Sequence, residues 1–283
     1  MRALTDRPRP SPHTARADEE DRVPPPQTPS PKTPPSPKTG FCYDLAAAAV
    51  VPFMRTLTRR EWRGTEHIPA KGGIVAVTNH LSYFDPIAIG HFLHTSGRPP
   101  RFLAKASLFN IPVVGKFLRS AGQIPVHREK RTAGDALAEA CSAIDEGECV
   151  VVYPEGTITR DPSLWPMVGK TGAVRIALRT GCEIVPIAQW GAQDVLLPYA
   201  KFPRLLPRKT MRMAAGPPVD LSAFRGDQAT PSLLKKATVV VMDAITALLA
   251  ELRGQEAPND PFDPSKFDVP SIGNPYKKRI HQR

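Results

Sequence analysis

The stretch that decides the fold runs from Gly73 to Pro86 and reads GIVAVTNHLSYFDP. Its first six residues are mainly aliphatic and β-branched, which predicts a buried strand over residues 73–78. A loop follows, and Asp85-Pro86 then opens a run of apolar residues at helical spacing. Asp at the N-cap with Pro after it is a common way to begin a helix. A strand, a loop and a helix in this order are the building unit of an α/β domain.

The same alternation of short apolar runs and helical periodicity continues along the chain. Two of the later helical segments end at Gly181 and Gly254, and glycine is a typical C-cap residue. The pattern indicates an α/β fold with a mixed, mostly parallel central sheet that is flanked by helices. Besides 73–78, strands are predicted over 123–126, 148–153 and 183–188, and helices over 133–146, 170–180 and 234–252.

Composition divides the 283 residues into three parts. Residues 1–40 hold 11 of the 33 prolines and few large apolar side chains, which is typical of a disordered arm. Residues 41–254 carry the alternating pattern and are the predicted folded domain, whereas residues 255–283 are expected to form a basic, loosely ordered tail. No run of 18 apolar residues occurs in the sequence, so a transmembrane helix is not expected.

The start of the folded domain, residues 41–60, predicts an amphipathic helix that Pro52 interrupts or kinks. Such a helix fits two different roles. It could lie at a membrane surface with its arginines toward the lipid headgroups, or it could be an ordinary packing helix. The sequence leaves both roles open.

Positive charge is unevenly distributed. The chain holds 38 Lys and Arg against 27 Asp and Glu, a net charge of +11, and the excess gathers in residues 101–131, 199–212 and 277–283. Basic stretches of this kind suit nucleic acid, an anionic lipid surface or a phosphorylated substrate, or they are simply solvated faces. No common nucleic-acid-binding motif occurs, so we expect no nucleic-acid partner. The four cysteines form no CxxC pair, so we expect no metal site.

His80 is the first candidate for catalysis, because it stands where the first strand gives way to a loop. Asp85 follows five residues later and could accept the Nδ1 proton of His80, which would leave Nε2 free to act as a base. The alternative is that Asp85 only begins the helix. No Gly-x-Ser-x-Gly motif supplies a nucleophile, and no cysteine stands beside a second histidine. A His–Asp pair alone predicts direct transfer to a hydroxyl group that the substrate brings.

Three further clusters accompany predicted strands. Gly122–Arg128 (GQIPVHR) places an arginine in the most basic part of the chain, which suits a phosphate group but also fits a surface side chain. Tyr153–Arg160 (YPEGTITR) puts Glu155 at the end of a buried strand, beside a glycine that permits close approach of a ligand. Val185–Gly191 (VPIAQWG) ends a strand on glycine. Taken singly, each cluster is ordinary turn or core sequence.

Together and in this order, the four clusters resemble the glycerophospholipid acyltransferase family, typified by 1-acylglycerol-3-phosphate acyltransferase. The family's blocks read Asn-His-x4-Asp, Gly-x-Ile-x-Val-x-Arg, Pro-Glu-Gly-Thr-Arg-Ser and Val-Pro-x4-Gly. Residues 105–112 (KASLFNIP) also resemble the family's linker between the first two blocks. The resemblance covers residues 41–254, which makes that segment the expected acyltransferase domain. The matching positions are His80 and Asp85, Gly122–Arg128, Glu155–Thr157 and Val185–Gly191.

The resemblance implies transfer of a fatty acyl group from acyl-CoA or acyl-carrier protein to the free hydroxyl of lysophosphatidic acid, giving phosphatidic acid. It implies no cofactor and no metal, because the thioester donor is already activated. The implied site comprises a general base and the residue that orients it, His80 and Asp85; acceptor-phosphate ligands, Lys105, Arg128 and Arg160; substrate-binding residues, Asn79, Glu155, Gly156 and Thr157; and motif-shaping residues, Gly122, Val185, Pro186 and Gly191.

One position departs from the family pattern. The family has arginine after Glu-Gly-Thr, whereas this chain has Ile158 and carries Arg160 two residues later. The departure leaves the acyl-transfer chemistry intact but admits another lipid acceptor, such as a glycolipid or an aminolipid. A non-catalytic lipid-binding relative is the remaining alternative.

The substrates that the resemblance implies are amphiphilic, so we expect a peripheral protein on the cytoplasmic face of the cell membrane. The helix over 41–60 and the basic stretches would dock the protein on phospholipid. The expected partners are the membrane phospholipid surface, the lysophospholipid acceptor and, for one of the two donors, acyl-carrier protein.

Overall fold

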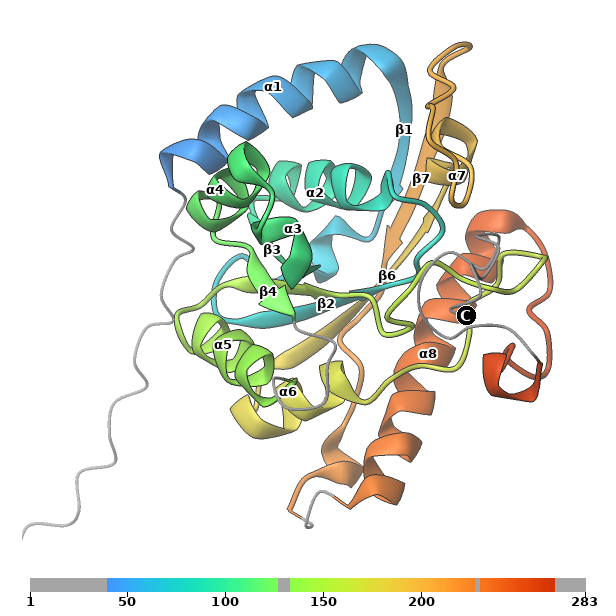
Figure 1. Ribbon diagram of the computed structural model, residues 1–283. Coiled ribbons are helices and arrows are strands. Elements are labelled where there is room, and N and C mark those ends of the chain that lie inside the picture. Colours follow the sequence, from blue (N-terminus) through green and yellow to red (C-terminus); the bar gives the residue numbers. More distant parts are fainter. Residues whose placement is uncertain (1–39, 127–132, 227–229, 268–283) are drawn as a thin grey trace, which may run out of the picture. The chain divides into compact units, whose positions relative to one another are not determined.

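The computed structural model describes residues 40–126, 133–226 and 230–267, and in these ranges seven strands form one sheet (Figure 1). The strand order is β1-β7-β6-β2-β5-β3-β4. Neighbouring strands are parallel except β6 and β7, which are antiparallel. The predicted mixed, mostly parallel sheet is therefore confirmed. The strands are β1 (Thr58–Arg63), β2 (Ile74–Thr78), β3 (Pro100–Lys105), β4 (Ile124–Val126), β5 (Cys149–Val152), β6 (Glu183–Trp190) and β7 (Lys209–Ala215).

Helices cover both faces of the sheet (Figure 1). In β2, Val75 and Val77 pack with one helical layer, and Ile74 and Ala76 pack with the other. Because this strand is buried on both faces, it reads as an unbroken apolar run. One layer holds α5 (Ala133–Asp145), α6 (Gly172–Thr180) and α8 (Pro231–Arg253); the other holds α1 (Phe41–Leu57), α2 (Asp85–Thr95), α3 (Ala106–Phe109), α4 (Pro112–Ser120) and α7 (Ala192–Val195); short 3-10 turns lie at Thr65–His67, Ser222–Phe224 and Pro264–Lys266.

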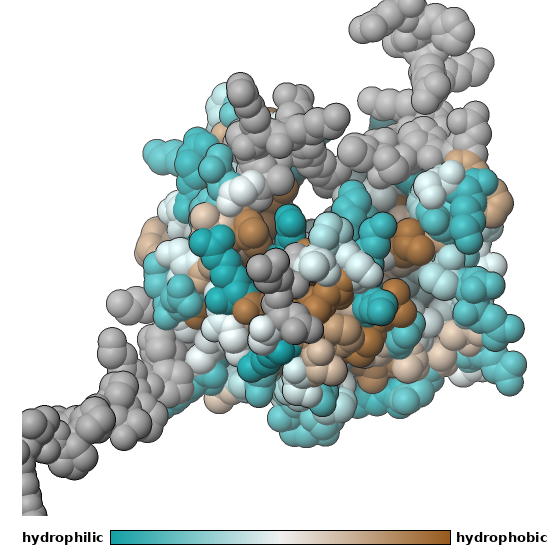
Figure 2. Space-filling view, turned by 90° about the horizontal axis from the view of Figure 1, so that it is seen from below, coloured by the Kyte–Doolittle hydropathy of each residue, from teal (hydrophilic) through white to brown (hydrophobic). Residues whose placement is uncertain are grey.

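The α1 helix presents apolar side chains to solvent. Phe41, Leu45 and Phe53 are 81%, 59% and 43% exposed and lie on one face of the helix, while Met54 points into the core. On the side of the molecule where α5 and α6 lie, hydrophobic surface is broken into patches bordered by hydrophilic side chains (Figure 2). None of the helices in the described ranges is both long and apolar enough to cross a bilayer.

Periodicity located the three strands at the middle of the sheet, β6, β2 and β5, and the edge strand β4, but it missed the other three strands. The predicted helix over 41–60 is too long: it ends at Leu57, because residues 58–63 pair with β7 as an edge strand. A single helix runs through Pro52, so the predicted interruption there is wrong. The strands β1, β3 and β7 were not predicted. The arm up to residue 39 and the tail from residue 268 lie outside the described residues.

A buried histidine lies where α2 packs on β1. His91 is 1% exposed, meets the ring of Trp62 edge-on at 4.9 Å, and neither ring nitrogen has a hydrogen-bond partner among the described residues. Burial, and secondarily the charges of Arg60 and Arg55, lower the pKa of His91 from its ordinary 6.5 to about 4. The imidazole is therefore neutral in the folded protein at neutral pH.

This histidine should make the fold sensitive to acid. Between about pH 6.5 and pH 4 the unfolded chain binds a proton at His91 that the folded protein does not, so the free energy of unfolding falls as the pH falls. We expect His91→Leu to lose less stability than the unsubstituted protein over this interval, as measured by urea unfolding. His67→Leu, on the 3-10 turn, is the matched control. An equal loss in all three proteins would contradict the assignment.

Candidate active site

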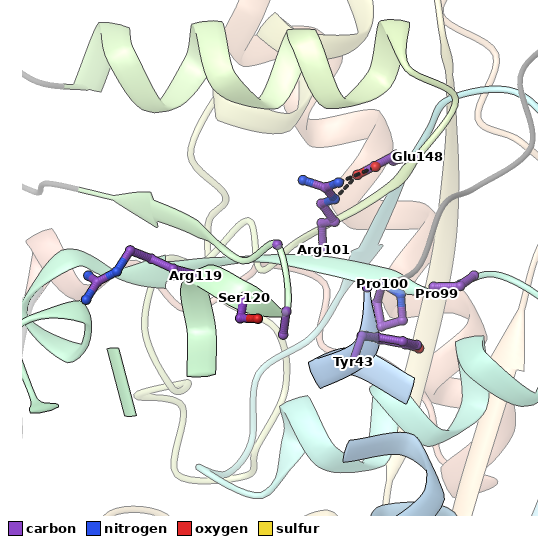
Figure 3. Close-up of a pocket in the computed structure, with 10 residues that line it drawn as sticks. Tyr43, Pro99, Pro100, Arg101, Arg119, Ser120 and Glu148 are labelled. Atoms are coloured by element: carbon purple, nitrogen blue, oxygen red, sulfur yellow. Dashed lines mark hydrogen bonds and ion pairs between the residues drawn. The ribbon is translucent and has the colours of Figure 1, made fainter. Parts of the chain in front are cut away.

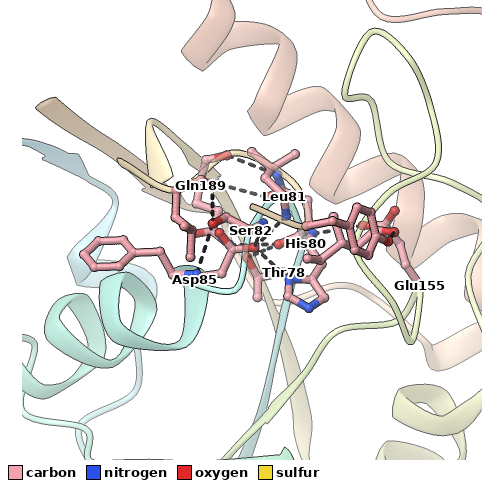
Figure 4. A network of polar contacts seen from close by, with 12 residues as sticks. Thr78, His80, Leu81, Ser82, Asp85, Glu155 and Gln189 are labelled. Carbon is pink, nitrogen blue, oxygen red and sulfur yellow. Dashed lines mark hydrogen bonds and ion pairs between the residues drawn. The ribbon is translucent and has the colours of Figure 1, made fainter. Parts of the chain in front are cut away.

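Most of the predicted site residues that the structure describes lie at one edge of the sheet. Parallel strands bring their carboxyl ends to the same edge, which is where open α/β sheets bind their ligands. Hydrogen bonds at this edge join residues as far as 114 positions apart in the sequence, and Figure 4 shows part of the network they form. His80 and Asp85 follow β2, Lys105 ends β3, residues 155–160 follow β5, and Gly191 follows β6.

His80 and Asp85 form a hydrogen-bonded pair. Nδ1 of His80 lies 2.7 Å from Oδ2 of Asp85 (Figure 4). A carboxylate oxygen accepts hydrogen bonds, so the shared proton belongs to Nδ1 and Nε2 is left as the basic nitrogen. The His80 side chain is 15% exposed and the Asp85 side chain is fully buried. A substrate can therefore reach the imidazole, while the carboxylate acts from behind it.

The loop between β2 and α2 fixes the position of Asp85. Its Oδ2 also accepts hydrogen bonds from the backbone N–H groups of Leu81, at 2.5 Å, and Ser82, at 2.9 Å. Asp85 is the first residue of α2 rather than the residue before it, and its side chain caps no helix N–H. Asp85 thus does more than begin a helix: its carboxylate holds its own loop and the imidazole together.

An aromatic stack supports the imidazole. The ring of His80 lies against Tyr153, with centroids 4.2 Å apart, and Tyr153 stacks in turn on Phe102 at 6.5 Å. Burial raises the pKa of Tyr153 well above its ordinary value, so the phenol stays neutral. Tyr153 was not among the predicted site residues, although it opens the Tyr153–Arg160 cluster. The stack limits how far the His80 ring can rotate.

Glu155 joins the loop after β2 to the segment after β5. The residue is 2% exposed, and its two carboxyl oxygens accept hydrogen bonds from the backbone N–H of His80, at 2.9 Å, and of Met167, at 3.1 Å. The backbone N–H of Thr159 donates in turn to the carbonyl oxygen of His80 at 2.8 Å. Burial raises the pKa of Glu155 to about 8, against the lowering effect of these hydrogen bonds. Its expected contact with substrate stays a prediction.

Asn79 joins β2 to β6. Its side-chain amide donates to the carbonyl oxygen of Gln189 at 3.0 Å and accepts from the Gln189 backbone N–H at 2.9 Å. The Gln189 side chain donates to the Asn79 carbonyl oxygen at 2.9 Å. Both residues are buried, so these bonds fix the start of the His80 loop. A contact between Asn79 and substrate also stays a prediction.

Arg160 lies at this edge of the sheet with a partner that was not predicted. Its guanidinium donates to the hydroxyl of Tyr199, lies over the Tyr199 ring at 4.9 Å, and is 3.4 Å from Oγ1 of Thr157. Tyr199 adopts a left-handed φ of 62°, which is costly for a bulky residue. Tyr83 meets its ring edge-on at 5.9 Å. The only sequence signal for Tyr199 is its place at the start of the basic stretch 199–212.

Six further predicted residues lie in or after the strands or outside the described residues. Val185 and Pro186 are interior residues of β6. Gly191 follows that strand with φ 116°, and a Cβ there would lie 2.0 Å from the Thr210 carbonyl oxygen. Lys105 is exposed at the end of β3, and Gly156 adopts φ 69° in the turn after Glu155. Arg128 lies outside the described residues.

Gly122 is not brought to this edge. It precedes β4 and lines a pocket of about 350 Å³ at the amino ends of the strands, together with Tyr43, Pro100 and Arg119 (Figure 3). Arg101, which also lines this pocket, is paired with Glu148. The pocket is separate from the His80 site, because the two lie at opposite ends of the parallel strands.

A family model matches the part of the chain that carries these residues. Residues 59–190 match the family model described as Acyltransferase. This segment contains β1 to β6 and includes His80, Asp85 and Glu155. The resemblance found in the four motifs is thereby confirmed: this part of the chain is similar to the acyltransferase family.

The chain is also similar to curated proteins. The chain is 33% identical over 135 residues to a 1-acyl-sn-glycerol-3-phosphate acyltransferase of Borreliella burgdorferi, covering 47% of this chain and 52% of that protein. It is 31% identical over 153 residues to a chloroplast 1-acyl-sn-glycerol-3-phosphate acyltransferase of Brassica napus, covering 53% and 42%. The chain thus spans about half the length of the curated relatives it matches.

The fold itself has a solved counterpart. It resembles the crystal structure of the 1-acyl-sn-glycerophosphate (LPA) acyltransferase PlsC from Thermotoga maritima, with a TM-score of 0.55 over 76% of this chain and 83% of that one. The sequence identity is 21%, so this likeness concerns the fold alone.

Glu155 should give the fold a second pH dependence. Its pKa is about 8 in the folded protein and near 4.5 in the unfolded chain, so between these values only the folded state holds the proton. The free energy of unfolding therefore falls as the pH rises through this interval. We expect Glu155→Gln to flatten that fall, as measured by urea unfolding at about pH 5, 6.5 and 8.

The same substitution also removes a hydrogen bond. A glutamine side chain has one acceptor oxygen, so its NH2 group would face one of the two backbone N–H donors and leave it without a hydrogen bond. This should lower the free energy of unfolding by about 1–3 kcal/mol near pH 5. Glu183→Gln, at the exposed start of β6, is the matched control. If Glu155→Gln kept the pH dependence of the unsubstituted protein, the burial of this carboxyl group would not be its cause.

Proposed function

We propose that this protein transfers a fatty acyl group from a thioester, acyl-CoA or acyl-carrier protein, to the free hydroxyl of lysophosphatidic acid, giving phosphatidic acid. The observation that carries the proposal is the His80–Asp85 pair, set within a segment that matches the acyltransferase family model, with Nε2 of His80 free of the carboxylate. The names of the two curated relatives support the choice of acceptor.

The mechanism follows from the direction of the imidazole. Nε2 of His80 removes the proton of the acceptor hydroxyl, and the resulting alkoxide attacks the thioester carbon. When the tetrahedral intermediate collapses, the thiolate leaves and takes the proton back from Nε2. Asp85 stabilises the imidazolium between these two steps through its 2.7 Å hydrogen bond to Nδ1. The chain itself forms no covalent intermediate in this scheme.

The acceptor phosphate would bind on the basic side of the same edge. Arg160 and Lys105 stand at this edge after β5 and β3, and Arg128 is the third proposed ligand. Thr157 and Tyr199 hold the Arg160 guanidinium, which limits its freedom before a phosphate arrives. The side chain of Ile158, which stands where the family has arginine, is apolar and buried, so the polar contacts at this turn come from neighbouring residues.

We propose no cofactor and no metal for this reaction, because a thioester is already an activated acyl donor. Among the residues that the structure describes, no three His, Cys, Asp or Glu side chains gather as metal ligands would.

The protein would meet its substrates at the cytoplasmic face of the membrane. The apolar face of α1, with Phe41, Leu45 and Phe53, suits insertion among lipid headgroups. The neighbouring α4 adds exposed Val113 and Phe117 beside the exposed Lys116. An apolar face next to basic residues fits an anionic phospholipid surface.

Replacing the base tests the chemistry. We expect His80→Ala to lower kcat/KM for acyl transfer from acyl-CoA to lysophosphatidic acid by about 10²- to 10⁴-fold, because the acceptor hydroxyl loses its proton acceptor. Membrane binding should persist, as measured by flotation with vesicles. His67→Ala, beyond the end of β1 at the opposite edge, is the control. Undiminished product formation by His80→Ala would exclude the proposed base.

A second experiment tests the acceptor. We expect the unsubstituted protein to acylate lysophosphatidic acid faster than unphosphorylated monoacylglycerol, and Arg160→Gln to raise KM for the phosphorylated acceptor selectively. The exposed Arg175→Gln on α6 is the control for loss of positive charge. Equal rates on both acceptors would exclude the phosphate-binding role, and preference for a glycolipid or an aminolipid would identify a different acceptor.

A further inference from the structure

The segment between α7 and β7, residues 196–208, is fastened to the candidate active site at its start. The hydroxyl of Ser82 donates to the carbonyl oxygen of Leu196 at 2.6 Å. Three residues later, Tyr199 holds Arg160 and meets the ring of Tyr83. The segment, called here the 196–208 loop, therefore starts against both the loop of His80 and the segment after Glu155.

The same loop is fastened to α1 at its end. The guanidinium of Arg208 donates to the carbonyl oxygens of Arg55 and Thr58, each at 2.9 Å. Between its ends, the side chain of Leu205 packs on the core layer beneath α2. The backbone N–H of Arg204 donates to the carbonyl oxygen of Val195, which closes the loop on itself. These contacts give the loop a defined position.

Between these anchors the loop turns apolar and basic side chains to solvent. Phe202 is 84% exposed and Leu206 is 77% exposed, which are unusual values for side chains of this size. Lys201 and Arg204 stand beside them and are exposed as well. No Asp or Glu occurs from residue 195 to residue 215.

We propose that the 196–208 loop is a membrane-contacting element that inserts Phe202 and Leu206 among the headgroups of an anionic bilayer. This inference rests on the proposed function and names a surface through which the active site meets the lipid. Large apolar side chains gain free energy at the interface, and lysine and arginine beside them are attracted to anionic lipid. The Arg208 hydrogen bonds put the loop next to the end of α1, whose Phe53 is also exposed.

The position of the loop makes the surface useful to the reaction. Its two anchors are the C-terminal end of α1 and the two segments that carry His80 and Arg160. A bilayer that receives Phe202 and Leu206 would therefore lie beside the edge of the sheet where the acceptor must enter. An acceptor could reach His80 from the headgroup layer without passing through bulk water.

The test separates membrane contact from catalysis. Binding of Phe202→Ser/Leu206→Ser to vesicles of phosphatidylcholine with about 30% phosphatidylglycerol is measured by flotation, beside Lys201→Gln/Arg204→Gln. We expect the first variant to partition at least about 10-fold more weakly, because two large apolar side chains are lost. We expect the second to bind more weakly and to lose most of its sensitivity to salt. Val239→Ser, at an exposed apolar position on α8, is the matched control.

Acyl transfer is then measured on two acceptors with a short-chain acyl-CoA. We expect the ratio of turnover on vesicle-embedded lysophosphatidic acid to turnover on a dispersed short-chain analogue to fall about 10-fold in Phe202→Ser/Leu206→Ser. An equal loss on both acceptors would make the loop part of the active site or the fold and overturn the proposal. Unchanged vesicle binding would also overturn it.

The vesicle-binding measurement does not depend on acyl transfer. If the unsubstituted protein acylated neither acceptor, the proposed function would fail, while the vesicle measurement would still decide whether the loop contacts lipid.

Discussion

The arrangement of the candidate active site depends on one buried carboxyl group. Glu155 gives up contact with water to accept hydrogen bonds from the backbone of His80 and of Met167, which ties the loop after β2 to the segment after β5. Burying such a group is unfavourable unless its hydrogen bonds are made, and the raised pKa of about 8 records that cost. The Thr159 N–H donates to the carbonyl oxygen of His80, so the histidine backbone is held at both polar groups.

Several arginines near the amino ends of the strands use their charge within the protein. Near the amino ends of the strands, Arg98 is fully buried and donates to the carbonyl oxygens of Gly72 and Gly147, and Arg101 is paired with Glu148. Arg119 donates to the carbonyl oxygen of Phe109. Arg98 and two arginines of the basic stretch 101–131 thus stabilise turns and helix ends, and the net charge of +11 overstates what is available to an anionic ligand.

The sequence was sufficient for the central strands and the proposed catalytic pair because both are local signals. A buried parallel strand is a run of apolar residues, and His80 and Asp85 are five positions apart on one loop. The edge strand β1 (TRREWR) could not be predicted, because it is mostly charged and becomes a strand only by pairing with β7. Tyr199 is separated from Arg160 by 39 positions, and no pattern along the chain reveals that contact. Glu155 was located correctly at the end of its strand, but its hydrogen bonds to two backbone N–H groups required the fold.

The hydrogen bond between Glu155 and His80 has a consequence for how the protein reaches its working state. It closes a loop of 75 residues, and the pairing of Asn79 with Gln189 closes one of 110. Contacts between residues so distant in sequence form only after much of the chain has lost its freedom, which is slow. His80 and Asp85 can meet early, since they share a loop. The long-range hydrogen bonds that hold this loop in place form only when the sheet has assembled. The geometry of the candidate active site would then be among the last features to appear during folding.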